Sequence, residues 1–144
     1  MKRLMGTSND VALTILRVVL GVVFFAHGAQ KMLGWFGGFG FHGTMGAFTQ
    51  MGMPAALAFL IICTEFFGGL GLIFGLLTRI AAFGVGGLMV GAIFMVHMPN
   101  GFFMNWMGSQ KGEGIEYHLL VLAMAGALLL RGAGAFSLDR TLAK

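Results

Sequence analysis

The distribution of charge limits most strongly how this chain can fold. Between Arg79 and Lys111 the sequence contains no Asp, Glu, Lys or Arg. In the chain as a whole, 10% of the residues are charged and 58% are hydrophobic. A soluble domain carries about 25% charged residues, so this chain has too few polar side chains to cover a surface that faces water. We therefore predict a protein that is embedded in a lipid bilayer.

The remaining charges mark where the membrane-spanning segments end. Only Arg17 lies between Asp10 and Lys31, and only Glu65 lies between Lys31 and Arg79. A helix that spans the bilayer needs about 20 mainly apolar residues. The chain is therefore expected to form a single integral membrane domain over 1–144, an all-α bundle of four transmembrane helices. The predicted helices cover about 11–31, 55–78, 80–98 and 115–131, and a short turn at Thr78–Arg79 joins the second to the third.

The first predicted helix has one competing interpretation. Residues 18–28 have the composition of a signal-peptide core followed by small residues. Arg17 interrupts the apolar run that begins at Val11, and no separate domain follows this segment. We therefore expect the first helix to be retained in the folded protein.

The positions of the basic residues predict how the helices are oriented, because Lys and Arg are enriched in cytoplasmic loops near helix ends. Both termini are expected in the cytoplasm, with the two longer loops, 34–53 and 99–114, outside. The basic residues are scattered, so the net charge of +4 indicates orientation and not a nucleic-acid partner. Two basic residues, Lys31 and Lys111, fall at the outer end, and six fall at the cytoplasmic end: Lys2, Arg3, Arg79, Arg131, Arg140 and Lys144.

Small residues recur at a four-residue spacing on the predicted helices. The chain has 25 glycines, and small residues are paired in this way at Gly71–Gly75, Gly87–Gly91 and Ala123–Ala127. Within membranes, such pairs let helix backbones approach closely. We expect them to pack the helices of one bundle against each other, and an oligomer formed through the same faces is the alternative.

The sulfur-containing residues indicate no dedicated chemistry. Cys63 is the only cysteine, so an intramolecular disulfide and a relay of paired thiols are both excluded. The 12 methionines are spread over the helices and loops without a repeated motif, which adaptable packing explains better than copper handling does.

Several titratable side chains lie inside segments that must cross the bilayer. A charged side chain at the centre of a bilayer costs about 2.5–3.5 kcal/mol on insertion scales, so it is expected to face a partner, a cavity or water. We predict that the four helices place these groups in one layer in the outer leaflet, capped by Lys31. At 1.5 Å per residue from the cytoplasmic end, the depths are roughly 20 Å for Glu65 and His118, 22 Å for Glu116, 24 Å for His27 and 25 Å for His97.

Arg17 lies below this layer, at roughly 9 Å from the cytoplasmic end of its helix. Its side chain reaches Glu65 only in an extended conformation or through water. One interpretation is that Arg17, Lys31 and Glu65 form a buried polar network that fixes the helix register, since breaking one partner of such a network leaves a costly uncompensated charge. The other is that Glu65 takes part in binding a ligand.

The histidines of the layer raise the question of a cofactor. His27, His97 and His118 lie at depths from which two of them could bind a haem iron, and His97, His118 and Glu116 could bind a metal. Glu116 and His118 are two residues apart, however, and point in nearly opposite directions on a helix. No pair has the His-x₃-His type of spacing that is diagnostic of a metal site. We therefore expect neither haem nor a metal.

The chain contains three stretches that belong together: LRVVLGVVFFAHGAQKMLG, TEFFGGLGLIFGLLTR and GAGAFSLDR. In this order they resemble the DoxX family of small bacterial membrane proteins, and the resemblance extends from about Leu13 to Arg140. His97 and His118 are outside the family pattern. The positions that match it are Arg17, Gly28, Lys31, Glu65, Gly68, Gly69, Thr78, Arg79, Gly134, Ser137, Asp139 and Arg140.

The resemblance implies a multi-pass protein of the bacterial inner membrane with a link to quinones, because the family is associated with a terminal quinol oxidase and with thiosulfate:quinone oxidoreductase. The chain would then be a quinone-linked redox accessory subunit that works with a partner redox protein. The alternative is a non-enzymatic membrane protein that binds a lipid or small amphiphile, or scaffolds a partner complex. The sequence has no Rossmann fingerprint, P-loop or nucleophile elbow, so a soluble cofactor would have to come from another subunit.

Overall fold

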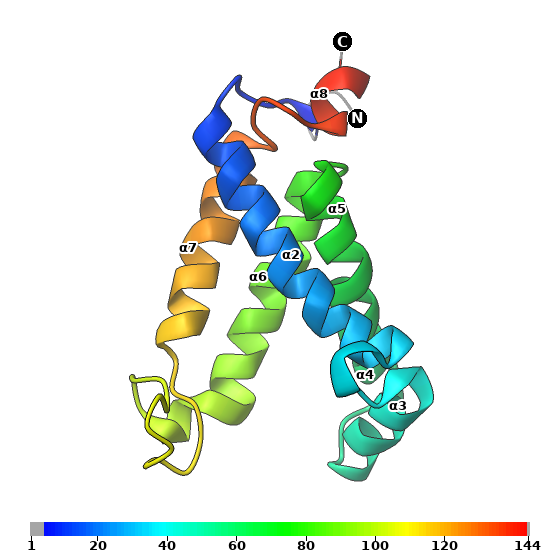
Figure 1. The fold of residues 1–144 in the computed structure, drawn as a ribbon, viewed down its shortest axis with the longest axis vertical. Coiled ribbons are helices and arrows are strands. Elements are labelled where there is room, and N and C mark those ends of the chain that lie inside the picture. Colours follow the sequence, from blue (N-terminus) through cyan, green and yellow to red (C-terminus); the bar gives the residue numbers. More distant parts are fainter. Residues whose placement is uncertain (1–4, 144) are drawn as a thin grey trace.

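The computed structural model describes residues 5–143, and in this part of the chain every regular element is a helix. The prediction of an all-α fold is therefore confirmed. Four helical passes run along the long axis of the molecule, and the two ends of the described chain lie together at one end of it (Figure 1). Lys2, Arg3 and Lys144, which contributed to the predicted orientation, lie outside the described residues.

The first pass is a single helix, α2 (Val11–Leu33). It begins where the Asp10 carboxylate accepts a hydrogen bond from the Ala12 N–H at 2.8 Å, which satisfies one of the free donors of the first turn. It ends because Gly34 adopts a left-handed conformation, with φ of 76°, that glycine reaches without steric cost. The helix predicted at 11–31 is thus confirmed and is slightly longer.

The second pass consists of three consecutive helical segments that together cover 55–74. Its predicted end at residue 78 is wrong. Gly75 and Leu77 have positive φ values of 66° and 50°, so the chain turns at 75–77, and Thr78–Arg79 already belongs to the third pass. The segments of the second pass are α4 (Ala55–Cys63), the π-helical turn η2 (Thr64–Gly68) and α5 (Gly69–Phe74).

The third pass also changes helix type along its length, and the fourth packs beside it. Their bounds agree with the predicted helices at 80–98 and 115–131 to within two residues. The third pass comprises α6 (Thr78–Ala92), the π-helical turn η3 (Ile93–His97) and the 3₁₀ turn η4 (Met98–Asn100), and the fourth is α7 (Glu116–Arg131), which contacts α6.

Three of the four passes have the length and composition of a membrane span. The helices at 11–33, 55–74 and 78–100 are each long and apolar enough to cross a bilayer. With 16 residues, α7 is roughly 24 Å long at 1.5 Å per residue, which is less than the hydrocarbon thickness of about 30 Å. The described residues therefore support three spans by this criterion, where the sequence predicted four.

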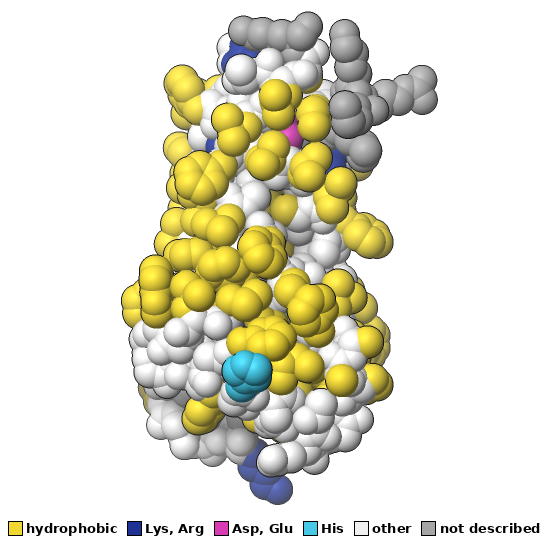
Figure 2. All heavy atoms as spheres, turned by 90° about the vertical axis from the view of Figure 1, so that its right-hand side faces the viewer, with side chains coloured by type: hydrophobic (Ala, Val, Ile, Leu, Met, Phe, Trp, Pro, Cys, Tyr) yellow, Lys and Arg dark blue, Asp and Glu magenta, His cyan; other side chains and the backbone are white. Residues whose placement is uncertain are grey.

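The surface of the bundle is apolar along its middle. Large hydrophobic side chains such as Ile15, Phe67, Phe83 and Leu130 are more than half exposed. In Figure 2 hydrophobic side chains cover the middle of the face, and charged side chains lie near its two ends. A water-soluble monomer rarely exposes apolar patches of this extent. This surface is therefore the one that a lipid bilayer covers.

The two ends of the bundle differ in structure. At the terminal end, the short helix α8 (Leu138–Leu142) lies above α5 (Figure 1), and its Asp139 N–H donates to the Gly75 carbonyl at 2.8 Å. At the loop end, the segment 34–53 contains the 3₁₀ turn η1 (Trp35–Gly37) and the helix α3 (Gly40–Gln50), which packs against α2 and α4. The segment 99–114 folds back on itself, with the Gly114 N–H donating to the Phe103 carbonyl at 3.1 Å.

Glycines bring α2 close to the second pass, but they are not the glycines that the spacing rule selected. A Cβ atom added at Gly21, Gly28 or Gly69 would collide with backbone atoms of the facing segment. At Gly87 and Gly91 an added Cβ would meet nothing within 4 Å, so this pair packs against no helix within the described chain. The expectation that Gly87–Gly91 closes a helix contact inside the bundle is therefore wrong. The core beside the close contact is formed by Leu20, Phe24, Leu72, Val85, Val121 and Leu128.

Candidate functional site

Arg17 is held at the terminal end of the bundle by backbone carbonyls. Its side chain is 1% exposed. It donates to the carbonyls of Ile73 at 2.7 Å, Ala133 at 2.9 Å and Phe136 at 2.6 Å, and also to that of Leu72. Each carbonyl belongs to the last turn of α5 or to the loop after α7, where a helix leaves its carbonyls without partners. Arg17 thus ties α2, α5 and the C-terminal segment together.

Asp139 also forms hydrogen bonds at the terminal end of the bundle. Its two carboxylate oxygens accept hydrogen bonds from the N–H groups of Leu77 at 2.7 Å and Thr78 at 2.9 Å. These are the free donors at the start of α6, so Asp139 acts as a cap supplied from α8. Arg79 in turn donates to the carbonyls of Leu129 and Leu130 near the end of α7. These side chains satisfy helix ends, and their role is structural.

The predicted network of Arg17, Lys31 and Glu65 is therefore only partly present. Lys31 Nζ lies 2.5 Å from Glu65 Oε2, and the two side chains are 24% and 12% exposed. Arg17 is not in this pair, because its guanidinium is bound to the backbone carbonyls at the terminal end. The two groups are separate, one at each end of the bundle.

Gly28 makes the Lys31–Glu65 pair possible. A Cβ atom at Gly28 would lie 2.7 Å from the carbonyl carbon of Glu65 and would also overlap the backbone of Phe66. Without a side chain there, α2 approaches η2 closely enough for Lys31, one turn further along α2, to reach Glu65. The ion pair between Lys31 and Glu65 therefore depends on the absence of a side chain at Gly28.

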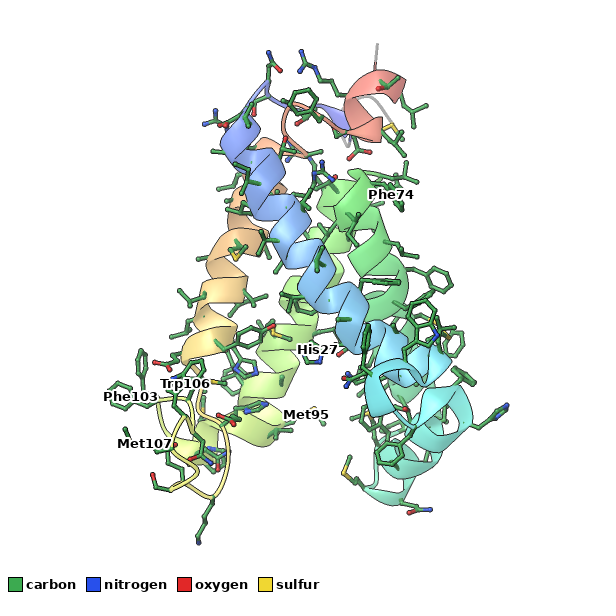
Figure 3. The ribbon with its side chains drawn as sticks, in the orientation of Figure 1. His27, Phe74, Met95, Phe103, Trp106 and Met107 are labelled. Atoms are coloured by element: carbon green, nitrogen blue, oxygen red, sulfur yellow. The ribbon has the colours of Figure 1, made fainter. Side chains whose placement is uncertain are left out.

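A cavity of about 400 Å³ lies toward the loop end, and we call it the polar cavity. Four of the titratable residues that we predicted in one layer line it. Figure 3 places His27 between α2 and α6. One or more of these residues comes from each helical pass: His27 from α2, Glu65 from η2, His97 from η3 and His118 from α7.

Two of the lining residues lie on π-helical turns. Glu65 is in η2 and His97 is in η3, in both cases within a helix that is otherwise α-helical or 3₁₀. A π-turn inserts an extra residue into the helix and changes the direction of the side chains that follow it. Such turns are rare and often occur at functional sites. Both turns are at the level of the polar cavity.

His97 and His118 lie against each other in the cavity wall. Their ring centroids are 4.1 Å apart, and Nδ1 of His97 is 2.8 Å from the Glu113 carbonyl oxygen. His118 is 5% exposed, and its Nδ1 atom has no hydrogen-bond partner among the described residues. The Gly114 backbone is near this ring, but no hydrogen bond between it and Nδ1 has acceptable geometry. A buried nitrogen without a partner is unfavourable, which makes it available to a ligand.

Glu116 does not join the predicted layer. Its carboxylate accepts hydrogen bonds from the Met104 N–H at 3.0 Å and from Trp106 Nε1 at 3.3 Å, so it anchors the loop before α7. The argument that Glu116 and His118 point apart therefore selects His118 as the residue that faces inward. Glu113 and Tyr117 line the polar cavity and were not predicted. Tyr117 is the only tyrosine and precedes His118, but no spacing rule marks either residue.

The described residues offer no metal cluster in this cavity, and the His97–His118 pair has no space for a haem iron. Within residues 5–143, no group of three or more His, Cys, Asp or Glu side chains is placed to hold a metal ion. With metal–nitrogen bonds of about 2 Å, two imidazole rings on opposite sides of a metal have centroids about 6 Å apart. The His97 and His118 centroids are 4.1 Å apart, which leaves no room for an iron atom between the rings.

Comparison with known proteins relates the chain to one family of membrane proteins. The DoxX family model matches residues 12–98. The "Putative oxidoreductase CatD" of Bacillus subtilis is 31% identical over 135 residues, which cover 94% of this chain and 90% of CatD. The inner membrane protein YqjF of Escherichia coli is 31% identical over 136 residues, 94% of this chain and 95% of YqjF.

A third relative is the uncharacterized membrane protein Rv3486 of Mycobacterium tuberculosis. It is 31% identical over 152 aligned positions, which cover 99% of this chain and 88% of Rv3486. No solved structure matches the chain. The part that matches the family model contains nearly all of the first three passes. It includes Arg17, His27, Lys31, Glu65 and His97.

Proposed function

This chain belongs to the DoxX family of membrane proteins, and we propose that it binds a quinone headgroup in the polar cavity as a subunit of an inner-membrane oxidoreductase. The observation that carries the proposal is the convergence of His27, Glu65 and His118 from three helical passes on one cavity of about 400 Å³. The protein is a multi-pass protein of the bacterial inner membrane, as the sequence predicted.

The chemistry of the lining suits a quinone. Reduction of a quinone to a quinol takes up two electrons and two protons. The partnerless Nδ1 of His118 can donate a hydrogen bond to a quinone carbonyl, and imidazole exchanges protons readily near neutral pH. Glu65, already bound to Lys31, is a second group that can exchange a proton with the cavity. The electrons would come from a partner redox protein. The name of the relative, "Putative oxidoreductase CatD", agrees with redox chemistry.

The proposal includes a topology with α7 as the fourth span. The two ends of the described chain lie at the same end of the bundle, which needs an even number of crossings (Figure 1). α7 also packs beside α6, which has the length of a span. A short helix is accommodated by local thinning of the bilayer at modest cost. We place both termini in the cytoplasm and the polar cavity in the outer leaflet, within one membrane domain of residues 1–144.

A second candidate function is lipid binding without redox chemistry. It is favoured by a separate cavity of about 300 Å³ between α2 and α3, lined in part by Gln30, Lys31 and Thr44. An ammonium, an amide and a hydroxyl are groups that can hold a phosphate of a lipid headgroup. In this case the chain would bind phospholipid or support a partner complex.

Extraction of bound molecules tests the two candidates. The protein is purified in native lipid, its visible spectrum is recorded, and solvent-extracted molecules are identified by mass spectrometry. We expect about one quinone per chain, which is lost in His118→Leu and in Glu65→Gln but kept in His42→Leu. His42 is exposed on α3 and lines none of these cavities, so it is the matched control. Phospholipid alone would favour the second candidate, and a Soret band would show that the protein binds haem instead.

A further inference from the structure

A third cavity, of about 260 Å³, adjoins the polar cavity, and we call it the glycine cavity. Glu65, Met89 and Ala92 line both cavities, so the two share a wall. The glycine cavity lies between α6 on one side and α4 with the end of α3 on the other. Gly87 and Gly91 of α6 form part of its wall.

The two cavities differ in chemistry. The polar cavity has three histidines, two glutamates and a tyrosine in its lining. In the glycine cavity, Lys31 and Glu65 are the only lining residues with polar side chains, and they are bound to each other. All the other lining residues are glycine, alanine, aliphatic residues, methionine or phenylalanine. The pair of cavities therefore presents hydrogen-bonding groups on one side of Glu65 and hydrocarbon on the other.

The glycine cavity exists because of two missing side chains. An added Cβ at Gly87 or Gly91 would meet nothing within 4 Å, whereas those at Gly21 and Gly28 would collide with the facing backbone. Gly126 on α7 also meets open space, but Gly87 and Gly91 differ from it because they line this cavity, where the missing side chains leave space for a ligand.

The glycine cavity is accessible from the bilayer. Met95 and Val96 of η3, at its rim, are 61% and 59% exposed, and Figure 3 shows Met95 at the edge of the third pass on the side of α3 and α4. Met51 and Met53 lie on the opposite wall. Methionine side chains adapt to ligands of irregular shape. A hydrocarbon chain could therefore enter sideways from the lipid.

We propose that the glycine cavity holds the hydrocarbon tail of the ligand whose headgroup occupies the polar cavity, and that this ligand is an isoprenoid quinone. The inference rests on the proposed function, because it takes the headgroup site from there. Two observations support it: the cavities meet at Glu65, and the polar one contains the buried, partnerless Nδ1 of His118. The Lys31–Glu65 pair would lie where the headgroup joins its tail.

Photolabelling locates the tail directly. The probe is a quinone with a diazirine at the end of an alkyl tail, incubated with the purified full-length protein in lipid nanodiscs. After photolysis, labelled peptides are identified by mass spectrometry. We expect the label mainly within residues 87–96, with at least a fivefold decrease when an excess of the same quinone without a tail is present.

Three glycine variants distinguish the cavity from the lipid-facing surface. Gly87→Leu and Gly91→Leu fill the cavity with a side chain that has room, and each should decrease labelling at least fivefold. Gly126→Leu, on α7, is the matched control, because its added Cβ also meets nothing within 4 Å and it lines neither cavity. It should leave the label unchanged. The melting temperature of each variant verifies that it is folded, and two cavity variants are available in case one is not.

Different failures have different meanings. Labelling that is unchanged in both Gly87→Leu and Gly91→Leu would overturn the tail site while leaving the headgroup proposal intact. Labelling that these variants remove but the tailless quinone does not displace would show a hydrocarbon site independent of the headgroup. That result would overturn the link between the cavities and count against the proposed function. Label spread evenly over the lipid-facing helices would overturn the inference completely.

Discussion

Lys31 and Glu65 form an ion pair between the first and second passes, with Nζ and Oε2 2.5 Å apart. Glu65 is thus a carboxylate with a partner, although it lies in a segment that is otherwise apolar. The pair also borders both cavities through Glu65. A charge in a low-dielectric region is expensive when it is alone and much less so when it is paired.

The first prediction is that Lys31 and Glu65 are energetically coupled. Lys31→Met and Glu65→Gln should each destabilise the protein by about 2 kcal/mol, because each leaves the other group without its charged partner. The double variant should be more stable than the sum of the two changes predicts, since it leaves no unpaired charge. Unfolding in detergent of the four proteins measures this coupling. Lys111→Met, at an exposed position, is the control, and strictly additive effects would contradict the pairing.

The second prediction concerns the structural role of Arg17. Arg17→Ala should destabilise the protein by about 3 kcal/mol or more, because it removes hydrogen bonds to several carbonyls and leaves a gap in a buried site. Arg131→Ala, at an exposed position near the same end, should have little effect. Thermal unfolding of both variants in detergent compares them. A wild-type melting temperature for Arg17→Ala would mean that the side chain extends to the membrane surface instead.

The third prediction tests the close approach of α2 and η2. Gly28→Ala should destabilise the protein by about 1–3 kcal/mol, because the new methyl group would overlap the backbone of Phe66 and separate the helices. It should also weaken the coupling between Lys31 and Glu65 in the same double-variant cycle. Gly126→Ala is the control, since its methyl group meets open space and alanine favours a helix by about 1 kcal/mol. Equal melting temperatures for the two variants would contradict the tight contact.

The fourth prediction concerns orientation in the membrane. In a Cys63→Ser background, a cysteine at Gln50, at the end of α3, should react with a membrane-impermeant maleimide in cells whose outer membrane has been permeabilised. A cysteine at Thr141, in α8, should react only after the inner membrane is opened. Both positions are exposed, so access depends on the side of the membrane. The reverse pattern would place the polar cavity in the cytoplasmic leaflet.

The helices could largely be predicted from the sequence, because gaps between charges and the length of a bilayer span determine them closely. The errors in the predicted helix bounds occur where local backbone conformation determines the end of a helix. The turn at residues 75–77 depends on a positive φ at Leu77, which no propensity favours, and on capping by Asp139 from the far end of the chain. Helix α3 is built from a glycine-rich segment that reads as a loop and is ordered by packing on α2 and α4.

Several residues of the candidate site could be grouped from the sequence, but their contacts could not be predicted. Counting residues along straight helices placed His27, Glu65, His97 and His118 at similar depths, and they line one cavity. The count could not foresee the π-turns that orient Glu65 and His97, nor Glu113, which reaches the cavity from a loop. It also could not assign the partners of Arg17, because they are backbone carbonyls and any residue type supplies those.

The hydrogen bonds of Arg17 also have a consequence for biosynthesis. Its acceptors at Ala133 and Phe136 lie 116 and 119 residues later in the chain. At about 5–20 residues per second, they are synthesised roughly 6–24 s after Arg17. During that interval the Arg17 guanidinium lacks part of its final shell of acceptors. A chain that stops before residue 133 cannot complete this shell, so a truncated product retains a buried cation with fewer acceptors than the finished protein provides.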